Sequence, residues 1–397
     1  KILVGPIKIN NDLTITAGQF NAGAGSFDIY VGGDWTNNGE FDAYYGTVYF
    51  DGADANINTG GSGDSKAFYN VVINSTGTKT LGGSIDISND LTVTAGTLDV
   101  STTNYNIAIV GDWNNSGNFE GRAATITVGG TLTINDGTFN APANPGSLSI
   151  DGGLFVGIGG AGTGTIIFNG GNGAITIGEG GFAITKGDLE TVTFNQGTGI
   201  INIRGNMSVL DASVFNKNVA GLIVFAGGIE QGLAAVGADI GNIQVSQKPL
   251  GGNTTLALHG DLDADDITID INQTLSAEEG NIHCSGNWTN NGNFEAGNSL
   301  VTFDGGDAVI STGGIGITHN FYNVIINSSG NISFPNDTEI DNNFTIQNAA
   351  SVYLSNIFNV KGNYEQNAGI INNTPATATF SGNCKINGGT FKFADVF

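Results

Sequence analysis

Two short acidic corners are the best candidates for chemistry in this sequence, and the chemistry they suggest is cation binding. Asp51-Gly52-Ala53-Asp54 recurs as Asp304-Gly305-Gly306-Asp307. Two carboxylates three residues apart in a turn could share a hard cation with backbone carbonyls, which makes calcium the candidate cofactor. The tandem nonapeptide of calcium-binding β-rolls is absent, and aspartates are ordinary residues of Asp-Gly turns. The metal ligands are therefore left unassigned.

Groups that could catalyse a reaction are few and scattered. Acid/base hydrolysis needs paired carboxylates, and polysaccharide lysis needs acidic residues beside Arg or Lys. The only two arginines, Arg122 and Arg204, are far apart in the sequence, and most acidic residues occupy Asp-Gly or Asn-Asp corners. We therefore expect a protein that is not an enzyme, without catalytic or cofactor-binding residues. A polysaccharide-active β-helix enzyme is the weaker alternative.

Histidine and cysteine show no metal-binding spacing. The histidines are His259, His283 and His319. His283 adjoins Cys284, but neighbours on a strand point to opposite faces. A disulfide between Cys284 and Cys384 would have to bridge about five repeat units, whereas disulfide-linked Cα atoms lie within ~7 Å. The sequence favours two isolated thiols.

Three tryptophans, Trp35, Trp113 and Trp288, occur in one recurring element. The element reads G-[DN]-W-[TN]-N-[NS]-G-x-F and occupies residues 33–41, 111–119 and 286–294. Exposed indoles could form a sugar-binding platform. The equivalent place of each tryptophan in its repeat instead favours a role in core packing.

Further elements recur at the same offsets. F-Y-N-V-x-I-N-S occurs at residues 68–75 and 321–328, and N-[DN]-[LF]-T-[IV] occurs at 11–15, 89–93 and 342–346. The interval from Trp35 to Trp113 equals that from Leu13 to Leu91. Internal repeats of this kind are the sequence sign of a solenoid, and here a super-repeat of about 78 residues runs through the chain. A divergent stretch lies between roughly 140 and 225.

Each super-repeat divides into about four units of roughly 20 residues, which is the length of one β-helix coil. Gly accounts for 64 of 397 residues, and Thr, Ile, Val and Asn fill much of the rest. Such composition is typical of short strands joined by tight corners. We predict an all-β, right-handed parallel β-helix with about 20 residues per coil. One continuous solenoid would span 1–397, with clear super-repeats at 1–140 and 220–397 and glycine-rich coils at 140–225. A β-sandwich is the structural alternative.

The formal net charge is −24. Nucleic acids and anionic membranes require Lys and Arg, so neither is an expected partner. The most apolar stretch, Gly221–Val236, contains Glu230 and Gln231 and is too short to span a bilayer. An acidic surface of this kind attracts cations.

With these elements in view, the chain resembles the large secreted β-helix repeat proteins of bacterial and archaeal surfaces, including filamentous-haemagglutinin-like and autotransporter-like adhesins. The resemblance rests on the three recurring elements and covers about residues 5–140 and 220–397. It implies an extracellular solenoid that serves as a stalk, coat, filament or adhesin, with surface glycans as one class of partner. It brings no catalytic residues to this chain.

The last repeat predicts a protein that continues or stacks end to end. Gly389-Thr390-Phe391-Lys392-Phe393 matches Gly137-Thr138-Phe139 and still resembles a coil in mid-repeat, without a polar cap. Open sheet edges are sticky, and an unclosed head-to-tail contact generates a filament. We expect an extracellular, non-catalytic fibre subunit with an adhesive role. A stalk segment of a monomeric surface adhesin is the alternative, in which further repeats of the same polypeptide cover the ends.

Overall fold

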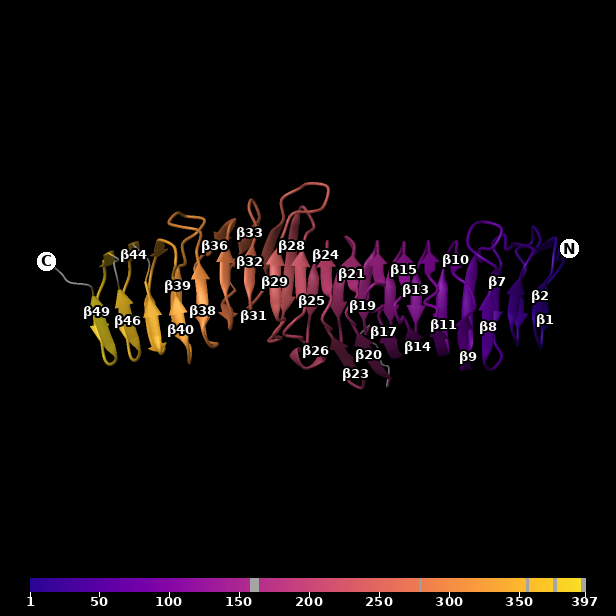
Figure 1. Cartoon of the computed structure of the whole chain (residues 1–397), viewed down its shortest axis with the longest axis horizontal. Coiled ribbons are helices and arrows are strands. Elements are labelled where there is room, and N and C mark those ends of the chain that lie inside the picture. Colours follow the sequence, from indigo (N-terminus) through magenta and orange to yellow (C-terminus); the bar gives the residue numbers. More distant parts are fainter. Residues whose placement is uncertain (158–163, 279, 355–356, 374–376, 394–397) are drawn as a thin grey trace. The chain divides into compact units, whose positions relative to one another are not determined.

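The computed structural model describes residues 1–157, 164–278, 280–354, 357–373 and 377–393. Short strands pair in parallel from coil to coil throughout this part of the chain (Figure 1). The predicted parallel β-solenoid is therefore confirmed; its right-handed sense stays a prediction. The chain divides into two units, Lys1–Asn202 and Ile203–Phe397. The one helical element among the described residues is a 3₁₀ turn, η1 (Ala212–Val214).

Each coil of the first unit contributes strands to up to three faces. The first face contains β1 (Ile7–Ile9), β4 (Ile29–Val31), β7 (Thr47–Phe50), β9 (Asn70–Leu81), β11 (Leu91–Asp99), β13 (Trp113–Asn115), β16 (Leu132–Ile134), β19 (Gly153–Val156) and β22 (Gly181–Ile184). The second contains β2 (Leu13–Ile15), β5 (Trp35–Asn37), β8 (Ala55–Asn58), later parts of β9 and β11, β14 (Asn118–Glu120), β17 (Gly137–Asn140), β20 (Thr165–Asn169) and β23 (Thr191–Asn195). The third contains β3 (Gln19–Asn21) with β6 (Glu40–Asp42), and β10 (Ile85–Ile87) with β12 (Ile107–Ile109), β15 (Thr125–Val128), β18 (Ser147–Ile150) and β21 (Ala174–Ile177).

The second unit repeats this scheme. One series is β25 (Met207–Val209), β28 (Glu230–Ala235), β30 (Thr255–Leu258), β33 (Thr274–Ser276) and β36 (Asn293–Glu295). Another is β27 (Leu222–Phe225), β29 (Asn242–Val245), β32 (Ile267–Ile269), β35 (Trp288–Asn290), β38 (Ala308–Ser311), β40 (Asn331–Ser333), β43 (Ser351–Tyr353), β46 (Ile370–Asn373) and β49 (Thr390–Phe393). The others are β31 (Leu262–Ala264), β34 (Ile282–Cys284), β37 (Leu300–Phe303), β39 (Asn323–Asn327), β42 (Phe344–Asn348), β45 (Tyr364–Gln366) and β48 (Cys384–Ile386), and β41 (Thr338–Ile340), β44 (Ile357–Val360) and β47 (Thr377–Phe380).

Coil length follows from residues that share a register position. Leu91, Trp113 and Leu132 are successive partners, so these coils take 22 and 19 residues. The coil from Leu154 to Phe182, which lies in the divergent glycine-rich stretch, takes 28 residues. Coils near the end of the second unit take 20 residues each. Coils of about 20 residues thus occur as predicted, but coils of 24 and 25 residues also lie outside the divergent stretch, as from Ile57 to Leu81 and from Glu230 to Thr255.

The super-repeat does not equal a whole number of coils. Trp35 lies between Leu13 and Ile57 on the second face, whereas Trp113 lies on the first face. The super-repeat therefore spans more than three coils but fewer than four, and the expectation of four units is wrong. Corners of variable length explain the difference, because some coils are longer than a quarter of the super-repeat.

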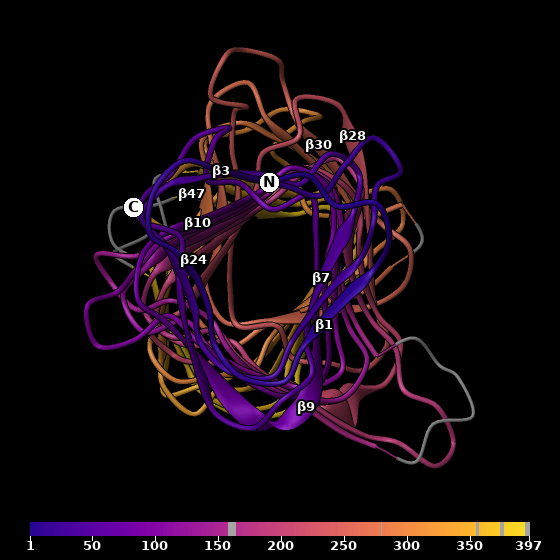
Figure 2. The same ribbon diagram turned by 90° about the vertical axis from the view of Figure 1, so that its right-hand side faces the viewer.

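The three tryptophans lie in the core, as their equivalent positions predicted. Trp35 is 1% exposed, and its ring centroid lies 4.9 Å from that of Phe41 and 5.1 Å from that of Phe68. Viewed end-on, the indigo and violet coils of the first unit run around a common interior that such side chains fill (Figure 2). One coil cannot bury its own apolar side chains, so stacking supplies the core.

A hydrogen-bond ladder explains why Gly-Asp or Gly-Asn precedes each tryptophan. The Asp112 backbone N–H donates to Asp90 Oδ1 at 2.9 Å, and the Thr131 N–H donates to Asp112 Oδ1 at 2.7 Å. Each of these aspartate side chains thus accepts a hydrogen bond from a backbone N–H of the next coil. A Cβ on Gly111 would lie 2.3 Å from Asp90 Oδ1, so only glycine fits against the carboxylate.

Candidate functional site

A left-handed corner recurs in the coils of both units and displays different side chains. It follows an apolar residue, a polar residue and, except before Ser101, a small residue, as in Phe41-Asp42-Ala43-Tyr44. The strands before it are in register, with Asn21 opposite Asp42 and Ser276 opposite Glu295. The corner residues with their φ angles are Gly23 (80°), Tyr44 (46°), Ser101 (65°), Arg122 (45°), Glu278 (49°) and Gly297 (55°).

Glycine is the residue that this backbone conformation favours. An L-residue in the left-handed region costs about 1–2 kcal/mol, because its Cβ approaches a carbonyl oxygen. Tyr44, Arg122 and Glu278 nevertheless occupy the corner, while Gly23 and Gly297 occupy it elsewhere at no such cost. The fold does not require these three long side chains, so they are the first places to look for function.

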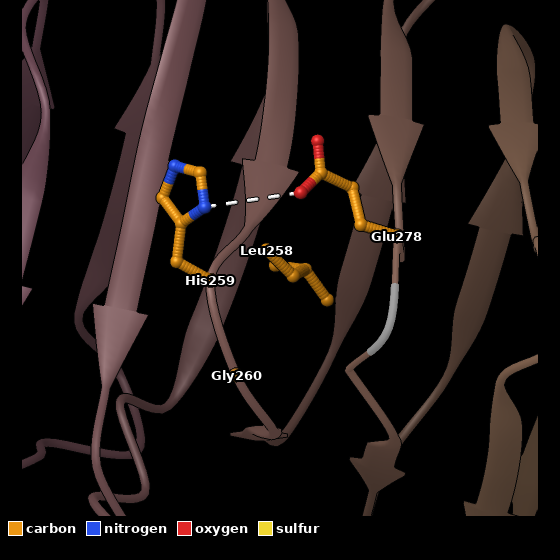
Figure 3. Close-up of a pocket in the computed structure, with 4 residues that line it drawn as sticks. All are labelled: Leu258, His259, Gly260 and Glu278. Atoms are coloured by element: carbon orange, nitrogen blue, oxygen red, sulfur yellow. Dashed lines mark ion pairs between the residues drawn. The ribbon is translucent and has the colours of Figure 1, made fainter.

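Glu278 and His259 border a large hollow, which has a volume of about 710 Å³. His259 directly follows β30, and Glu278 follows the adjacent strand β33. The two side chains point toward one another across Leu258, with His259 Nδ1 3.8 Å from Glu278 Oε2 (Figure 3). Their side chains are 56% and 44% exposed, so an ion pair here contributes at most about 1 kcal/mol.

The lining of this hollow supplies one acid/base pair. Its described lining residues are Leu258, His259, Gly260 and Glu278. A glycoside hydrolase needs two carboxylates that flank the scissile bond. Among the described lining residues Glu278 is the single carboxylate, so this hollow does not assemble that machinery from them.

Arg122 occupies the same type of corner, but its side chain pairs with a carboxylate of the preceding coil. Its Nε and Nη2 atoms each donate to a carboxylate oxygen of Asp99 at 2.6 Å. These bidentate hydrogen bonds lower the pKa of Asp99, and they raise the pKa of Arg122. Because Asp99 lies one coil below Arg122, this corner ties two coils together.

A ladder of charged groups crosses several coils of the second unit. Lys217 Nζ contacts the carboxylates of Asp239 and Asp265, the latter at 2.5 Å. Ser285 Oγ donates to Asp265 Oδ1 at 2.7 Å, and His283 Nδ1 lies 3.2 Å from Asp304 Oδ2. Asp263 lies between Asp239 and His283 in strand register. Lys217 thus lies beside two aspartates, Asp239 and Asp265, that are far from it in the sequence. The spacing of these residues in the sequence did not predict this cluster.

Two neighbouring carboxyls in that ladder titrate in opposite directions. Burial raises the pKa of Asp263, and the negative charge of Asp239 raises it further. Burial also acts to raise the pKa of Asp265, but hydrogen bonds from Lys217 and Ser285 outweigh it and leave that pKa lowered. Asp265 is therefore held ionised by its partners, whereas ionisation of Asp263 is disfavoured.

The two acidic corners proposed for calcium serve as ladder acceptors. Asp54 Oδ1 accepts the Thr78 N–H at 2.8 Å, and Asp307 Oδ1 accepts the Asn331 N–H at 2.7 Å. In the first corner, Lys8 Nζ lies 2.7 Å from Asp51 Oδ2. Within the described residues, no group of three or more His, Cys, Asp or Glu side chains could hold a metal ion. Calcium binding at these corners stays a prediction.

The cysteines are both free thiols, as expected from their separation. Cys284 is buried, whereas Cys384 is exposed. Burial raises the pKa of Cys284, and its Sγ lies 3.2 Å from the Asp265 carbonyl oxygen. Cys284 thus has the surroundings of an unreactive structural thiol.

Comparison with known proteins identifies no relative. No family model, curated protein or solved structure matches the chain. In the part of the chain that the structure describes, no helix is long and apolar enough to cross a membrane. The resemblance to surface adhesins therefore remains an expectation from the repeat elements.

Proposed function

We propose that the chain is a non-catalytic structural protein of an extracellular fibre, whose coil edges stack on the edges of further copies. The observation that carries this proposal is that core-facing positions are less buried in the first coil of the first unit and in the last coil of the second unit than in the coils stacked on them. In interior coils the same positions are buried. A β-solenoid buries these side chains only when another coil stacks on them.

The outer edge of the second unit carries unburied core positions. Tyr364 is 0% exposed, yet its register partner in the next coil, Cys384, is exposed. Gln366 is likewise 0% exposed, whereas its partner Ile386 is 51% exposed. β47, β48 and β49 have strand partners on one side only within the described residues. An unpaired edge of this kind is a template for another strand.

The outer edge of the first unit is also apolar. Ile7 and Leu13 are half-buried, whereas their partners one coil further on, Ile29 and Trp35, are each 1% exposed. A hollow of about 440 Å³ opens here, lined in part by Ile7, Leu13 and Phe20. Both edges thus offer parallel strands and apolar side chains, which supports a head-to-tail contact between copies.

Negative-stain electron microscopy of the chain, with calcium and with a chelator, tests this function. We expect filaments whose length increases with protein concentration. Loss of the filaments on chelation would assign calcium to the contacts between copies. Single particles at every concentration would contradict self-assembly and favour the stalk of a longer adhesin, in which further repeats of the same polypeptide cover the edges.

Ile386→Asp is the matched variant for this experiment. Because Ile386 holds a core-facing position at the edge, the substitution would place a charge inside the stacked contact. Val309→Asp is the control, since Val309 is 47% exposed on β38, within the stack. We expect the first variant to shorten filaments and the second to leave them unchanged.

A further inference from the structure

The corner at Tyr44 lines a second, smaller hollow. Its volume is about 150 Å³, and its lining includes Asp42, Tyr44, Asp64, Tyr69 and Ser88. Tyr44 is 42% exposed, so its ring is available to solvent. Buried Phe68 also lines the hollow. We propose that this hollow binds one neutral sugar ring of a surface glycan.

The strained backbone at Tyr44 supports a role for its side chain. Tyr44 has φ 46°, and the equivalent corner in the later copy of this sequence pattern is Gly297 with φ 55°. The same turn therefore forms there without a tyrosine, and glycine would avoid the steric cost. The hollow is also specific to the first copy, because exposed Ile317 stands where Asp64 stands in it.

The side chains around the hollow are those that a sugar requires. An aromatic ring offers an apolar face to the C–H bonds of a pyranose, and the tyrosine hydroxyl offers a polar tip. Tyr45, 68% exposed, packs edge-on against Tyr69 with ring centroids 5.0 Å apart, and this contact orients Tyr69. Ser88 and the carboxylate of Asp64 supply a hydroxyl and acceptor oxygens.

Asp42 is held in place for such a contact. Its Oδ2 accepts a hydrogen bond from Asn21 Nδ2 at 3.0 Å, and its Oδ1 accepts the Tyr44 N–H at 3.1 Å. Each carboxylate oxygen has two lone pairs, so acceptor capacity remains for a sugar hydroxyl. The polar groups of the hollow are thereby positioned before a ligand arrives.

Charge and size define the ligand class. Two carboxylates line the hollow, and nearby Lys66 donates to the Asn37 and Gly39 carbonyl oxygens instead of facing it. Anionic sugars would therefore be repelled. Pockets for drug-sized ligands measure roughly 300–1,000 Å³, so a hollow of about 150 Å³ suits a single ring at the end of a glycan. Two tyrosines do not enclose a quaternary ammonium as an aromatic cage does.

The test is saturation-transfer difference NMR with the methyl glycosides of glucose, galactose, mannose and N-acetylglucosamine. We expect at least one glycoside to show transfer to its ring protons at millimolar concentration. Tyr44→Gly should weaken that binding by about tenfold or more. It should not lower the melting temperature, because Gly297 already occupies the equivalent corner. Arg122→Gly changes the equivalent corner of another coil and should leave sugar binding unchanged.

Several results would overturn the inference. These are no transfer to any of the four glycosides, equal binding by Tyr44→Gly, or binding of tetramethylammonium in place of the sugars. The inference rests on the extracellular location in the proposed function but not on edge stacking. Tyr44→Gly should leave filaments intact, and Ile386→Asp should leave sugar binding intact, so the two proposals fail separately.

Discussion

Segments 33–88 and 286–341 are two copies of one sequence pattern in different units, and their interiors agree closely. The Trp35 and Phe41 ring centroids lie 4.9 Å apart at 77°, and those of Trp288 and Phe294 lie 4.8 Å apart at 76°. Thr59 Oγ1 lies within hydrogen-bonding distance of two carbonyl oxygens at its corner, and so does Thr312 Oγ1. The shared sequence pattern thus produces the same aromatic packing and the same corner contacts in both copies.

The two copies differ in their polar side-chain contacts and in the residue at the left-handed corner. Lys66 Nζ donates to the Asn37 and Gly39 carbonyl oxygens, whereas His319 Nδ1 lies 3.3 Å from Asn290 Nδ2. Tyr44 is replaced by Gly297 at the left-handed corner. The comparison teaches that the shared coil tolerates varied chemistry at corners, which is where a repeat protein can acquire recognition.

The deepest difference is a buried lysine. Lys79 is 0% exposed and donates to the Gly52 carbonyl at 3.0 Å, to the Ala53 carbonyl and to Ser75 Oγ at 2.8 Å. In the second copy Ile332 takes its place. There, Ser328 Oγ lies 3.0 Å and 2.7 Å from the corresponding carbonyl oxygens. Two solutions therefore place a donor against the same pair of carbonyl oxygens, a lysine ammonium in the first copy and a serine hydroxyl in the second.

The largest effect is expected from the aromatic clusters. Trp35→Ala and Trp288→Ala should each destabilise their own unit by about 3–5 kcal/mol, because each leaves a cavity among three phenylalanines. Hydrogen exchange read by mass spectrometry should show faster exchange mainly in coils near the substituted residue. Similar protection changes along all coils would contradict the nearest-neighbour stability expected of a solenoid.

Isoleucine, the residue at the equivalent position of the second copy, should replace Lys79 at little cost in stability. Lys79→Ala should cost about 2–3 kcal/mol in the free energy of unfolding, because it leaves a cavity where the fully buried lysine stem lay. Lys79→Ile should cost much less, since Ser75 can donate as Ser328 does. Adding Ser75→Ala to Lys79→Ile removes that donor and should restore the large loss. Urea unfolding followed by circular dichroism measures all three, and equal losses would refute the exchange of donors.

A glycine of the hydrogen-bond ladder should show a steric effect. Gly111→Ala should destabilise the chain by about 1–3 kcal/mol, because the new Cβ would lie 2.3 Å from Asp90 Oδ1. Gly306→Ala is the matched control, since no atom lies within 4 Å of its Cβ position. Thermal unfolding should separate the two, and equal shifts in melting temperature would disprove the close contact.

The smallest expected effect is a dependence of stability on pH. Burial lowers the pKa of Lys79 from its ordinary value of 10.5, so the folded chain loses this proton before the unfolded chain does. The free energy of unfolding should therefore rise, relative to that of Lys79→Ile, as pH increases from the lowered pKa toward 10.5. Denaturant titrations at several alkaline pH values measure this difference. A decrease over the same window would contradict it.

The fold was predictable from the sequence because a repeated pattern states its period directly. The core role of Trp35 followed from its recurrence, and the approximate coil length followed from the spacing of the markers. The relation of the super-repeat to whole coils did not follow from the sequence. Corner lengths, such as those in the long coil from Leu154 to Phe182, are known only from the strand register.

The sites were less predictable than the fold. A left-handed conformation at Tyr44 or Glu278 has no signal in a single residue, although the recurring apolar-polar-small triplet before it could have indicated the corner. The ladder around Lys217 joins residues up to 48 positions apart, and only strand register brings them together. A buried Lys79 also contradicts the ordinary preference of lysine for solvent.

Thiol labelling of Cys384 tests edge stacking most directly. Cys384 is exposed at a core-facing position of the outer coil, and buried Cys284 serves as the internal control. Maleimide labelling, located by mass spectrometry, should be fast at Cys384 in dilute protein and should slow as concentration rises, because a second copy would cover the edge. Slow labelling at Cys284 throughout would show that the fold is intact. Fast labelling of Cys384 at every concentration would contradict the stacking of copies.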